Sequence, residues 1–147
     1  MPNAQIKDVM SASCEWIAPT ATAQQAAKMM KSKDIGFLPV GENDKLVGTI
    51  TDRDIAMKIV ASDKDASSTS VRDCMNKKMY YCYDDQSVDE VCKNMAEMQV
   101  SRMPVVNRAK RLVGVVSYAD LSAAATPSVF TTAQQVLKSV AAGKKAA

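Results

Sequence analysis

Residues 46–54, Leu-Val-Gly-Thr-Ile-Thr-Asp-Arg-Asp, return later in the chain as residues 112–120, Leu-Val-Gly-Val-Val-Ser-Tyr-Ala-Asp. The similarity extends upstream, because residues 6–41 align with residues 71–106 without a gap. An internal repeat defines the folding unit before any secondary-structure propensity is considered. Two copies are too few for a solenoid. The sequence therefore predicts one compact body of two related halves, with a pseudo-twofold axis and a pair of equivalent clefts.

Each copy predicts the element order β-α-β-β-α. In the first copy, a short extended piece at residues 16–18 precedes a helix whose apolar residues have the spacing of one buried face. Two strands follow at residues 35–40 and 46–50, joined by a polar turn. A second helix runs from Asp52 to about Ser62. The second copy predicts the same elements at residues 81–83, 100–106 and 112–116 and from Tyr118 to about Ala125, with its first helix after residue 87.

The ends of several helices carry their own signals. Thr22 and Ser87 precede the first helix of each copy and are candidate N-caps. After the second copy, Thr126-Pro127 is typical of an N-cap followed by proline at the first helical position. An apolar face then continues at Val129, Ala133, Val136, Leu137 and Val140. This pattern predicts a further helix that either packs onto its own module or docks a partner, and the packing role is favoured.

The composition is that of a globular protein without a membrane span. The chain has 147 residues, of which 47% are hydrophobic and 24% are charged. No apolar run approaches the ~20 residues of a membrane-spanning helix, and the first residues lack the apolar region of a signal peptide. A cytoplasmic location is therefore expected. The net charge is +3, and the only basic cluster is Lys144-Lys145, which argues against a nucleic-acid partner.

The chain contains no histidine and four cysteines: Cys14, Cys74, Cys82 and Cys92. The cysteines are far apart and form no C-x-x-C pair, so no metal site is expected. Cys74 and Cys92 align with Val9 and Ala27 of the first copy, which indicates apolar core positions. Without histidine the usual general base near neutral pH is missing, and no catalytic residues are assigned.

The end of each last strand carries one pattern: glycine, two residues, a hydroxyl, two residues, aspartate. The pattern occurs at Gly48, Thr51 and Asp54, and again at Gly114, Ser117 and Asp120. It places a carboxylate in a first helical turn, where free N–H groups favour an anion. The carboxylate can accept bonds from both hydroxyls of a ribose, and the glycine lets a ligand or another backbone come close. The spacing also resembles a capping box. Its occurrence in both copies favours a ligand role, which a cap does not exclude.

With these motifs the chain resembles a tandem pair of CBS domains, the Bateman module, of the small stand-alone bacterial kind. The resemblance covers about residues 6–125. Its other marks are the opening segments Asp8-Val9-Met10 and Asp73-Cys74-Met75 and the proline-containing strands at 36–40 and 101–105. It implies an α+β fold of the CBS type. The predicted parts are a first CBS motif (1–62), a linker (63–70), a second motif (71–125) and a C-terminal helix with a basic tail (126–147).

The resemblance also implies a function. Such modules are non-enzymatic regulators that sense AMP, ADP, ATP or S-adenosylmethionine in clefts between the two motifs, without a catalytic cofactor. They commonly pair face to face, so a homodimer and an unknown regulated protein are expected. Met-rich helices could supply adaptable contact surface, although helical methionines more often lie in the core. The methionines concerned are Met29, Met30, Met57, Met95 and Met98.

Residue roles follow from the same resemblance. The aspartate would hold the ribose diol and the hydroxyl would assist, which assigns Asp54 with Thr51 and Asp120 with Ser117. The base would lie near the first extended pieces, with backbone contacts from Ile17 and Cys82. Arg102 and Arg53 would contact phosphate, with a solvated surface charge as the equal alternative for Arg53. The copies differ here, because Phe37 replaces Arg102 and Ala119 replaces Arg53, so two unequal sites are expected.

Two other classes of function stay open. In the first, the chain is an interaction or dimerisation module without a small ligand, and the motifs serve only as helix caps. In the second, the four cysteines form a thiol-based redox or metal sensor, a weaker hypothesis because two of them fit core positions. A catalytic role has the least support, since no nucleophile is paired with a base.

Overall fold

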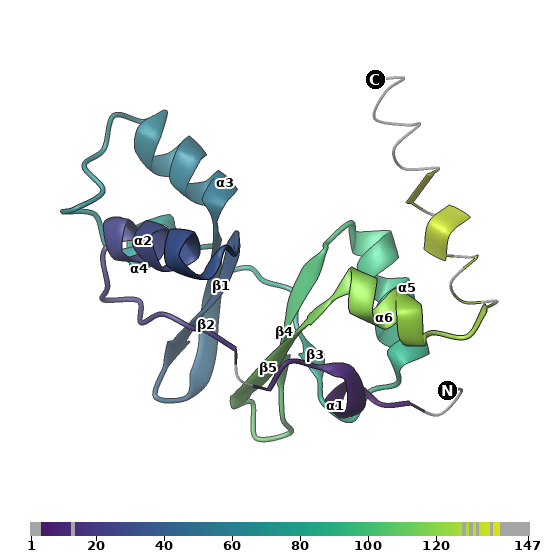
Figure 1. Cartoon of the computed structure of the whole chain (residues 1–147). Coiled ribbons are helices and arrows are strands. Elements are labelled where there is room, and N and C mark those ends of the chain that lie inside the picture. The colour runs from purple at the N-terminus through teal and green to yellow at the C-terminus, as the bar shows by residue number, and fades with distance from the viewer. Residues whose placement is uncertain are drawn as a thin grey trace. The chain divides into compact units, whose positions relative to one another are not determined.

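The chain folds into two compact units, each built from both sequence repeats. The computed structural model describes residues 4–12, 14–127, 129, 131, 133–135 and 137–138. Unit 1 comprises Met1–Cys14, Tyr81–Ala109 and Val113–Ala147, and unit 2 comprises Glu15–Tyr80 and Lys110–Leu112. Both contain helices and strands (Figure 1), so the α+β class is confirmed. Within the described residues, no helix combines the length and the apolar character needed to cross a membrane.

Unit 2 is organised around an antiparallel hairpin. Its elements are α2 (Ala23–Lys33), β1 (Phe37–Glu42), β2 (Lys45–Thr51), α3 (Asp52–Ile55), the π-helical turn η1 (Ala56–Val60) and α4 (Val71–Cys74). β1 pairs with β2 in a register that sets Phe37 opposite Thr51. Ile17 pairs in parallel with Val40 on β1, and Asn76 pairs antiparallel with Thr49 on β2. Each strand of the hairpin therefore has a further extended segment beside it.

Unit 1 repeats this plan with the second copy. Its elements are α1 (Ile6–Val9), β3 (Cys82–Tyr83), α5 (Val88–Met98), β4 (Arg102–Val106), β5 (Leu112–Ser117) and α6 (Tyr118–Ala124). The strands form a sheet in the order β3-β4-β5, in which β3 runs parallel to β4. Ser11 pairs antiparallel with Val115 on β5. Ser11 in unit 1 thus takes the place that Asn76 has in unit 2.

The opening segments of the two copies, taken as residues 6–11 and 71–76, exchange between the repeats, which the sequence did not predict. The Ile6 amide donates to the Gln86 carbonyl at 2.9 Å, so the start of the first copy is bound to the second. The Val71 amide donates to the Ala21 carbonyl at 2.7 Å, so the start of the second copy is bound to the first. Ile6 and Val71 are both fully buried. The opening segments are therefore structural parts of the unit that the other repeat forms.

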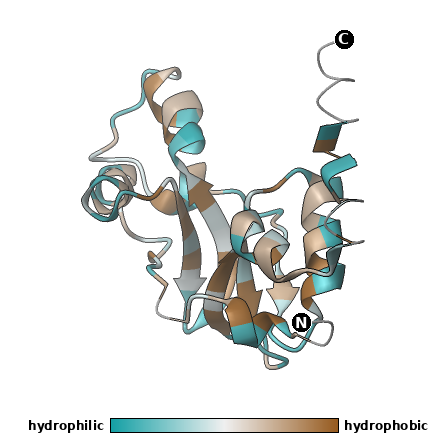
Figure 2. Cartoon of the chain, turned by 45° about the vertical axis from the view of Figure 1, so that its right-hand side comes forward, coloured by the Kyte–Doolittle hydropathy of each residue, from teal (hydrophilic) through white to brown (hydrophobic). Residues whose placement is uncertain are grey.

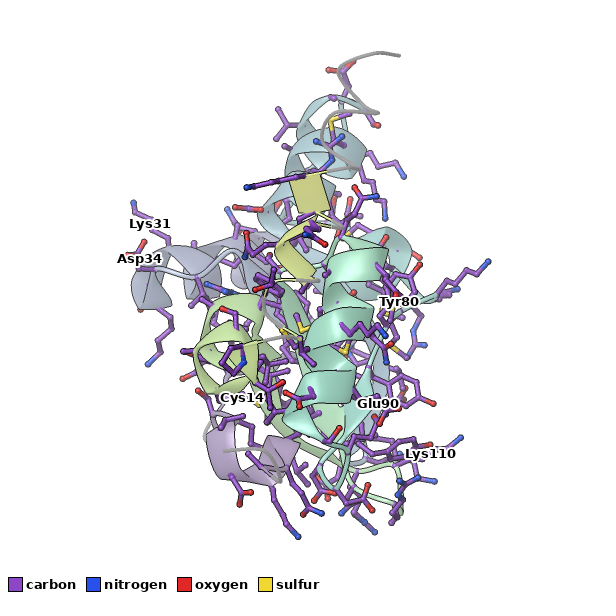
Figure 3. The ribbon with its side chains drawn as sticks, turned by 90° about the vertical axis from the view of Figure 1, so that its right-hand side faces the viewer. Cys14, Lys31, Asp34, Tyr80, Glu90 and Lys110 are labelled. Atoms are coloured by element: carbon purple, nitrogen blue, oxygen red, sulfur yellow. The ribbon has the colours of Figure 1, made fainter. Side chains whose placement is uncertain are left out.

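The two cores follow the predicted helical stripes. In unit 1, the apolar face of α5 is fully buried with strand residues Met103, Val105 and Val116. In unit 2, Ala23, Ala26 and Met30 of α2 pack with Leu38, Val40 and Ile50. Figure 2 shows brown, apolar residues recurring along the strands. The Thr22 and Ser87 side chains accept bonds from the amides of Gln25 and Glu90, which confirms both N-caps. Glu90 is labelled on α5 in Figure 3.

The closing helix of the first copy differs from the prediction. The sequence predicts one α-helix from Asp52 to about Ser62, but the α-form ends at Ile55 and residues Ala56–Val60 form a π-helix. The Ala61 amide accordingly donates to the Ala56 carbonyl at 2.9 Å, five residues back. Apolar spacing does not distinguish this wider turn from an α-helix.

The C-terminal segment packs onto unit 1. Residues 127, 129, 131, 133–135 and 137–138 are helical. Ala133 is fully buried, and Val129 and Leu137 pack against the same core. These contacts confirm the favoured packing role for the residues that are described. Val136, Val140 and Lys144-Lys145, which also entered the prediction, lie outside the described residues.

Candidate functional site

Both glycine-to-aspartate motifs lie where a strand passes into a helix. Thr51 ends β2 and is the N-cap of α3, and Ser117 ends β5 and is the N-cap of α6. The Thr51 hydroxyl accepts a bond from the Asp54 amide at 3.1 Å. The Ser117 hydroxyl accepts one from the Asp120 amide, also at 3.1 Å. The capping role is therefore present in both copies. Whether a ligand can also bind depends on which groups already contact the two carboxylates.

The Asp54 carboxylate is held by protein groups on both oxygens. Its Oδ2 accepts from the Thr51 amide at 2.9 Å, the Thr51 hydroxyl at 2.9 Å and the Asn76 side-chain amide at 2.7 Å. Its Oδ1 lies 3.4 Å from the Lys58 ammonium, and the aspartate side chain is only 13% exposed. This is a complete capping box with two added side chains.

The Asp120 carboxylate is in a different state. Asp120 is exposed, and α6 has the serine cap without the reciprocal bond from the aspartate side chain. Among the described residues, no amide or side chain donates a hydrogen bond to this carboxylate. Its acceptor positions therefore face solvent, and a ligand can occupy them without displacing a protein group.

The motif glycines accommodate the exchanged opening segments. A Cβ on Gly48 would lie 2.7 Å from Met75 Sδ and 2.9 Å from the Asn76 carbonyl oxygen. A Cβ on Gly114 would lie 2.7 Å from the Ser11 carbonyl oxygen. The sequence left open whether a ligand or another backbone approaches here. In both units it is the backbone of an opening segment that does so.

The other predicted residues divide between the units. Unit 2 contains Ile17 and Arg53 with Thr51 and Asp54, and unit 1 contains Cys82 and Arg102 with Ser117 and Asp120. Each of these two sets has one aspartate, one hydroxyl residue, one arginine and one residue of an extended piece. Within each set, the structure shows a contact between the hydroxyl residue and its aspartate.

The surroundings of the four remaining candidates differ. Arg53 and Arg102 are exposed. Ile17 is buried, and both its backbone groups are used, since its amide donates to Pro39 and its carbonyl accepts from Gly41. A base could reach only the second lone pair of that carbonyl. Cys82 is buried in β3 beside β4.

Sequence reasoning missed two residues of the first site. The Lys58 ammonium donates to the Cys74 carbonyl and to Asn76 Oδ1, each at 3.1 Å, besides its contact with Asp54. The spacing of Asp54 and Lys58, four positions apart, is one at which helical side chains meet and could have indicated this pair. Asn76 reaches Asp54 only because the opening segments exchange, and no local pattern indicates that.

Three cysteines are buried, which confirms the core assignment of Cys74 and Cys92 and extends it to Cys82. Burial raises the pKa of all three thiols, and that of Cys82 rises to about 12. Cys14, labelled in Figure 3, is half-buried. Within the described residues, no three Cys, Asp or Glu side chains are grouped as a metal site requires.

The raised pKa of Cys82 predicts slow alkylation and an alkaline loss of stability. The thiolate is the reactive form, so at pH 8 iodoacetamide should label Cys82 far more slowly than it labels the urea-unfolded chain. The unfolded thiol, with its usual pKa near 9.0, releases its proton first. This thiol's contribution to stability is therefore full below pH 9 and lost as the pH rises towards 12. Peptide mass spectrometry measures the labelling, and rapid native labelling of Cys82 would contradict its burial.

Comparisons with known proteins agree with the motif and fold. The CBS domain family model matches residues 6–61 and 71–126. The CBS domain-containing protein YhcV of Bacillus subtilis (strain 168) is 34% identical over 117 residues, which are 80% of this chain and 82% of that protein. A crystal structure of Hypoxic Response Protein I with two coordinated zinc ions has a TM-score of 0.74 at 34% identity, covering 82% of this chain and 98% of the other.

A third relative is known with adenosyl compounds. The CBS domain pair of protein MJ0100, solved in complex with 5′-methylthioadenosine and S-adenosyl-L-methionine, has a TM-score of 0.70 at 31% identity. The match covers 84% of this chain and 96% of that one. The two matched segments contain both repeats and both glycine-to-aspartate motifs. The chain therefore belongs to the CBS domain family and carries two CBS domains in tandem.

Proposed function

We propose that this chain is a non-catalytic regulatory module that binds an adenosyl ligand through Ser117 and Asp120. The observation that carries the proposal is the exposed Asp120 carboxylate, which receives no hydrogen bond from the described residues. It lies in a motif of the CBS family, and the related MJ0100 pair is known with two adenosyl compounds. A charged acceptor without a protein partner is available to a polar ligand.

The chemistry of this set suits a nucleoside. A carboxylate presents two oxygens and can accept one bond from each hydroxyl of a ribose diol. The Ser117 hydroxyl already accepts from the Asp120 amide, so the helix cap fixes where the carboxylate stands. Arg102 begins β4, the neighbour of β5, and is exposed. Its guanidinium has donors in the geometry that suits a phosphate.

Calorimetry on one substitution tests the proposal. Asp120→Ala removes both acceptor oxygens and should weaken the binding of AMP, 5′-methylthioadenosine or S-adenosylmethionine about tenfold or more, the loss of roughly one charge-assisted hydrogen bond. Isothermal titration calorimetry with ligand up to about 1 mM measures the affinity. A Kd of about 1 mM corresponds to a binding free energy of about −4.1 kcal/mol. Glu97→Ala, an exposed carboxylate on α5, is the charge-matched control and should leave affinity unchanged.

The alternative function predicts a different result. If the motifs act only as helix caps in an interaction module, none of these compounds should give heat with the native chain. Asp120→Ala should then remove only the small stabilisation that a first-turn carboxylate gives a helix, and change nothing else. Native binding that survives Asp120→Ala unchanged would also remove the assignment of this carboxylate.

We also propose that the module forms a homodimer through the helical surface that carries Met57 and Val60. Of the five methionines considered for such a surface, Met57 is 55% exposed, whereas Met30 and Met95 are buried. Val60, three residues after Met57 on η1, is 72% exposed. Large apolar side chains left in water favour an interface.

The dimer predicts a change of mass on substitution. Met57→Glu combined with Val60→Glu should convert the dimer to a monomer at micromolar concentration, because two charges per chain would face each other across a symmetric interface. Sedimentation equilibrium measures the mass. Lys28→Glu, on the exposed surface of α2, is the control. A native chain that is already a monomer would contradict the proposal.

A further inference from the structure

We propose that Lys58 and Asn76 lock the Asp54 carboxylate, so that each chain has one adenosyl site ready at Asp120 and a latent one at Asp54. The inference rests on the proposed function and goes beyond it, because it assigns the inequality of the two sites to two residues that the motif does not contain. The two copies differ in the groups around the carboxylate, although the motif itself is present in both.

The acceptor capacity of Asp54 is almost used up. A carboxylate oxygen has two lone-pair positions, yet Oδ2 receives three donors, from the Thr51 amide, the Thr51 hydroxyl and Asn76. Oδ1 faces the Lys58 ammonium at 3.4 Å. A ribose diol needs two acceptor positions, so its binding has to break at least one of these contacts. It would therefore bind Asp54 about tenfold or more weakly than an unoccupied carboxylate.

The lysine of the lock is itself bound to three protein groups. The Lys58 ammonium donates to the Cys74 carbonyl and to Asn76 Oδ1, and forms an ion pair with Asp54 Oδ1. Lys58 thus joins the motif carboxylate to the exchanged opening segment. In this arrangement its charge is already paired with a carboxylate of the protein. Both the acceptor and the cation that a nucleotide would use are therefore committed to the protein.

The second copy has the same frame without the lock. Asn76 exchanges two backbone bonds with Thr49, at 2.7 and 3.0 Å, and Ser11 exchanges two with Val115, at 2.9 and 3.1 Å. Ser11 is therefore the equivalent of Asn76, with a side chain too short for the same reach. The aligned sequences set Ala124, which has no donor, at the position of Lys58. Exchanging these residues between copies changes the lock and leaves both motifs intact.

The experiment is a count of AMP molecules bound per chain at an AMP concentration that fills the Asp120 site but leaves a site of about tenfold or more weaker affinity mostly empty. Native protein should bind one, and the site should be lost in Asp120→Ala. Lys58→Ala combined with Asn76→Ser gives the first copy the residues of the second, and should raise the count from one to two. Adding Asp54→Ala to this pair should return it to one. Lys58→Arg, which keeps a cation with several donors, should stay at one.

The reverse transplant gives a second test that leaves unit 2, which contains Asp54, untouched. Ser11→Asn combined with Ala124→Lys installs the lock beside Asp120, and should weaken AMP binding about tenfold while Asp120 itself is unchanged. Ser11 is exposed and Ala124 is half-buried against the core of unit 1. Because neither position lies in unit 2, this variant remains informative if the first pair fails to fold. Circular dichroism of each variant checks that it folds.

The outcomes separate this inference from the proposed function. Three results would overturn the lock and leave adenosyl binding standing. They are a native count of two, a count that stays at one in the opened variant (Lys58→Ala with Asn76→Ser), and unchanged AMP binding in the reverse transplant (Ser11→Asn with Ala124→Lys). Weaker binding in the opened variant would identify Lys58 as a ligand contact and also overturn it. If native protein binds no adenosyl compound, the proposed function fails, and the lock is upheld only if the opened variant gains a site that Asp54→Ala removes.

Discussion

Ile6→Ala should loosen the unit formed by the second repeat and leave the unit formed by the first repeat intact. Ile6 is fully buried in the core of unit 1, and its amide donates to the Gln86 carbonyl. Truncation of a buried isoleucine to alanine costs about 2–5 kcal/mol, through lost burial and the cavity left behind. This is a large share of a typical domain stability of about 5–15 kcal/mol. Hydrogen exchange measured by mass spectrometry should therefore accelerate in residues 82–117.

Val71→Ala is the matched control, because Val71 aligns with Ile6 and is buried in unit 2. It should accelerate exchange in residues 23–51 instead. The crossed pattern follows only if the opening segments belong to the opposite repeats. Faster hydrogen exchange in residues 23–51 after Ile6→Ala would contradict the crossing of the opening segments between the repeats.

Gly48→Ala should lower stability by about 1–3 kcal/mol, the usual cost of placing extra volume in a packed site. The new Cβ would lie 2.9 Å from the Asn76 carbonyl oxygen, which belongs to backbone paired with Thr49 and cannot turn aside. The Met75 sulfur, at 2.7 Å, would also have to shift. None of the glycines among the described residues has a positive φ, so close approach, and not backbone conformation, sets the requirement. Urea unfolding measures the change.

Gly36→Ala in the same unit is the control. Its Cβ would meet Asp52 Oδ2 at 2.7 Å, the far end of a flexible side chain that can move towards solvent. This variant should stay near native stability. Equal losses in the two variants would mean that the approach of the opening segment is not what requires glycine at position 48.

The sequence predicted those parts of the fold that depend on residues close together along the chain. Apolar spacing indicated α2 and α5, hydroxyl residues marked their N-caps, and the repeat gave the order of elements. Cys92 was placed in the core because its aligned partner is alanine. The exchange of the opening segments was not predicted, since it depends on contacts such as Ile6 with Gln86, whose residues are distant along the chain.

The same distinction applies to the site. The repeated motif predicted the positions of Asp54 and Asp120 and their caps, because a cap involves residues three positions apart. The sequence also predicted two unequal sites, but from the arginines at 53 and 102. The difference between the carboxylates themselves lies in Lys58 and Asn76. Asn76 reaches Asp54 across 22 positions of sequence, a contact that only the folded unit provides.

The exchanged opening segments have a consequence for the ancestry of the chain. In this fold the opening segment of one copy covers the strand edge of the other, as Asn76 does for β2 at Thr49, so a chain encoded by a gene with a single copy would leave that edge of its own β2 uncovered. An uncovered strand edge invites pairing with another chain, and the missing piece is one that a second single-copy chain could donate, as in a domain swap. Duplication of such a gene would turn an association between two molecules into a contact within one, independent of concentration. The tandem pair is then the smallest heritable form that closes both sheets by itself.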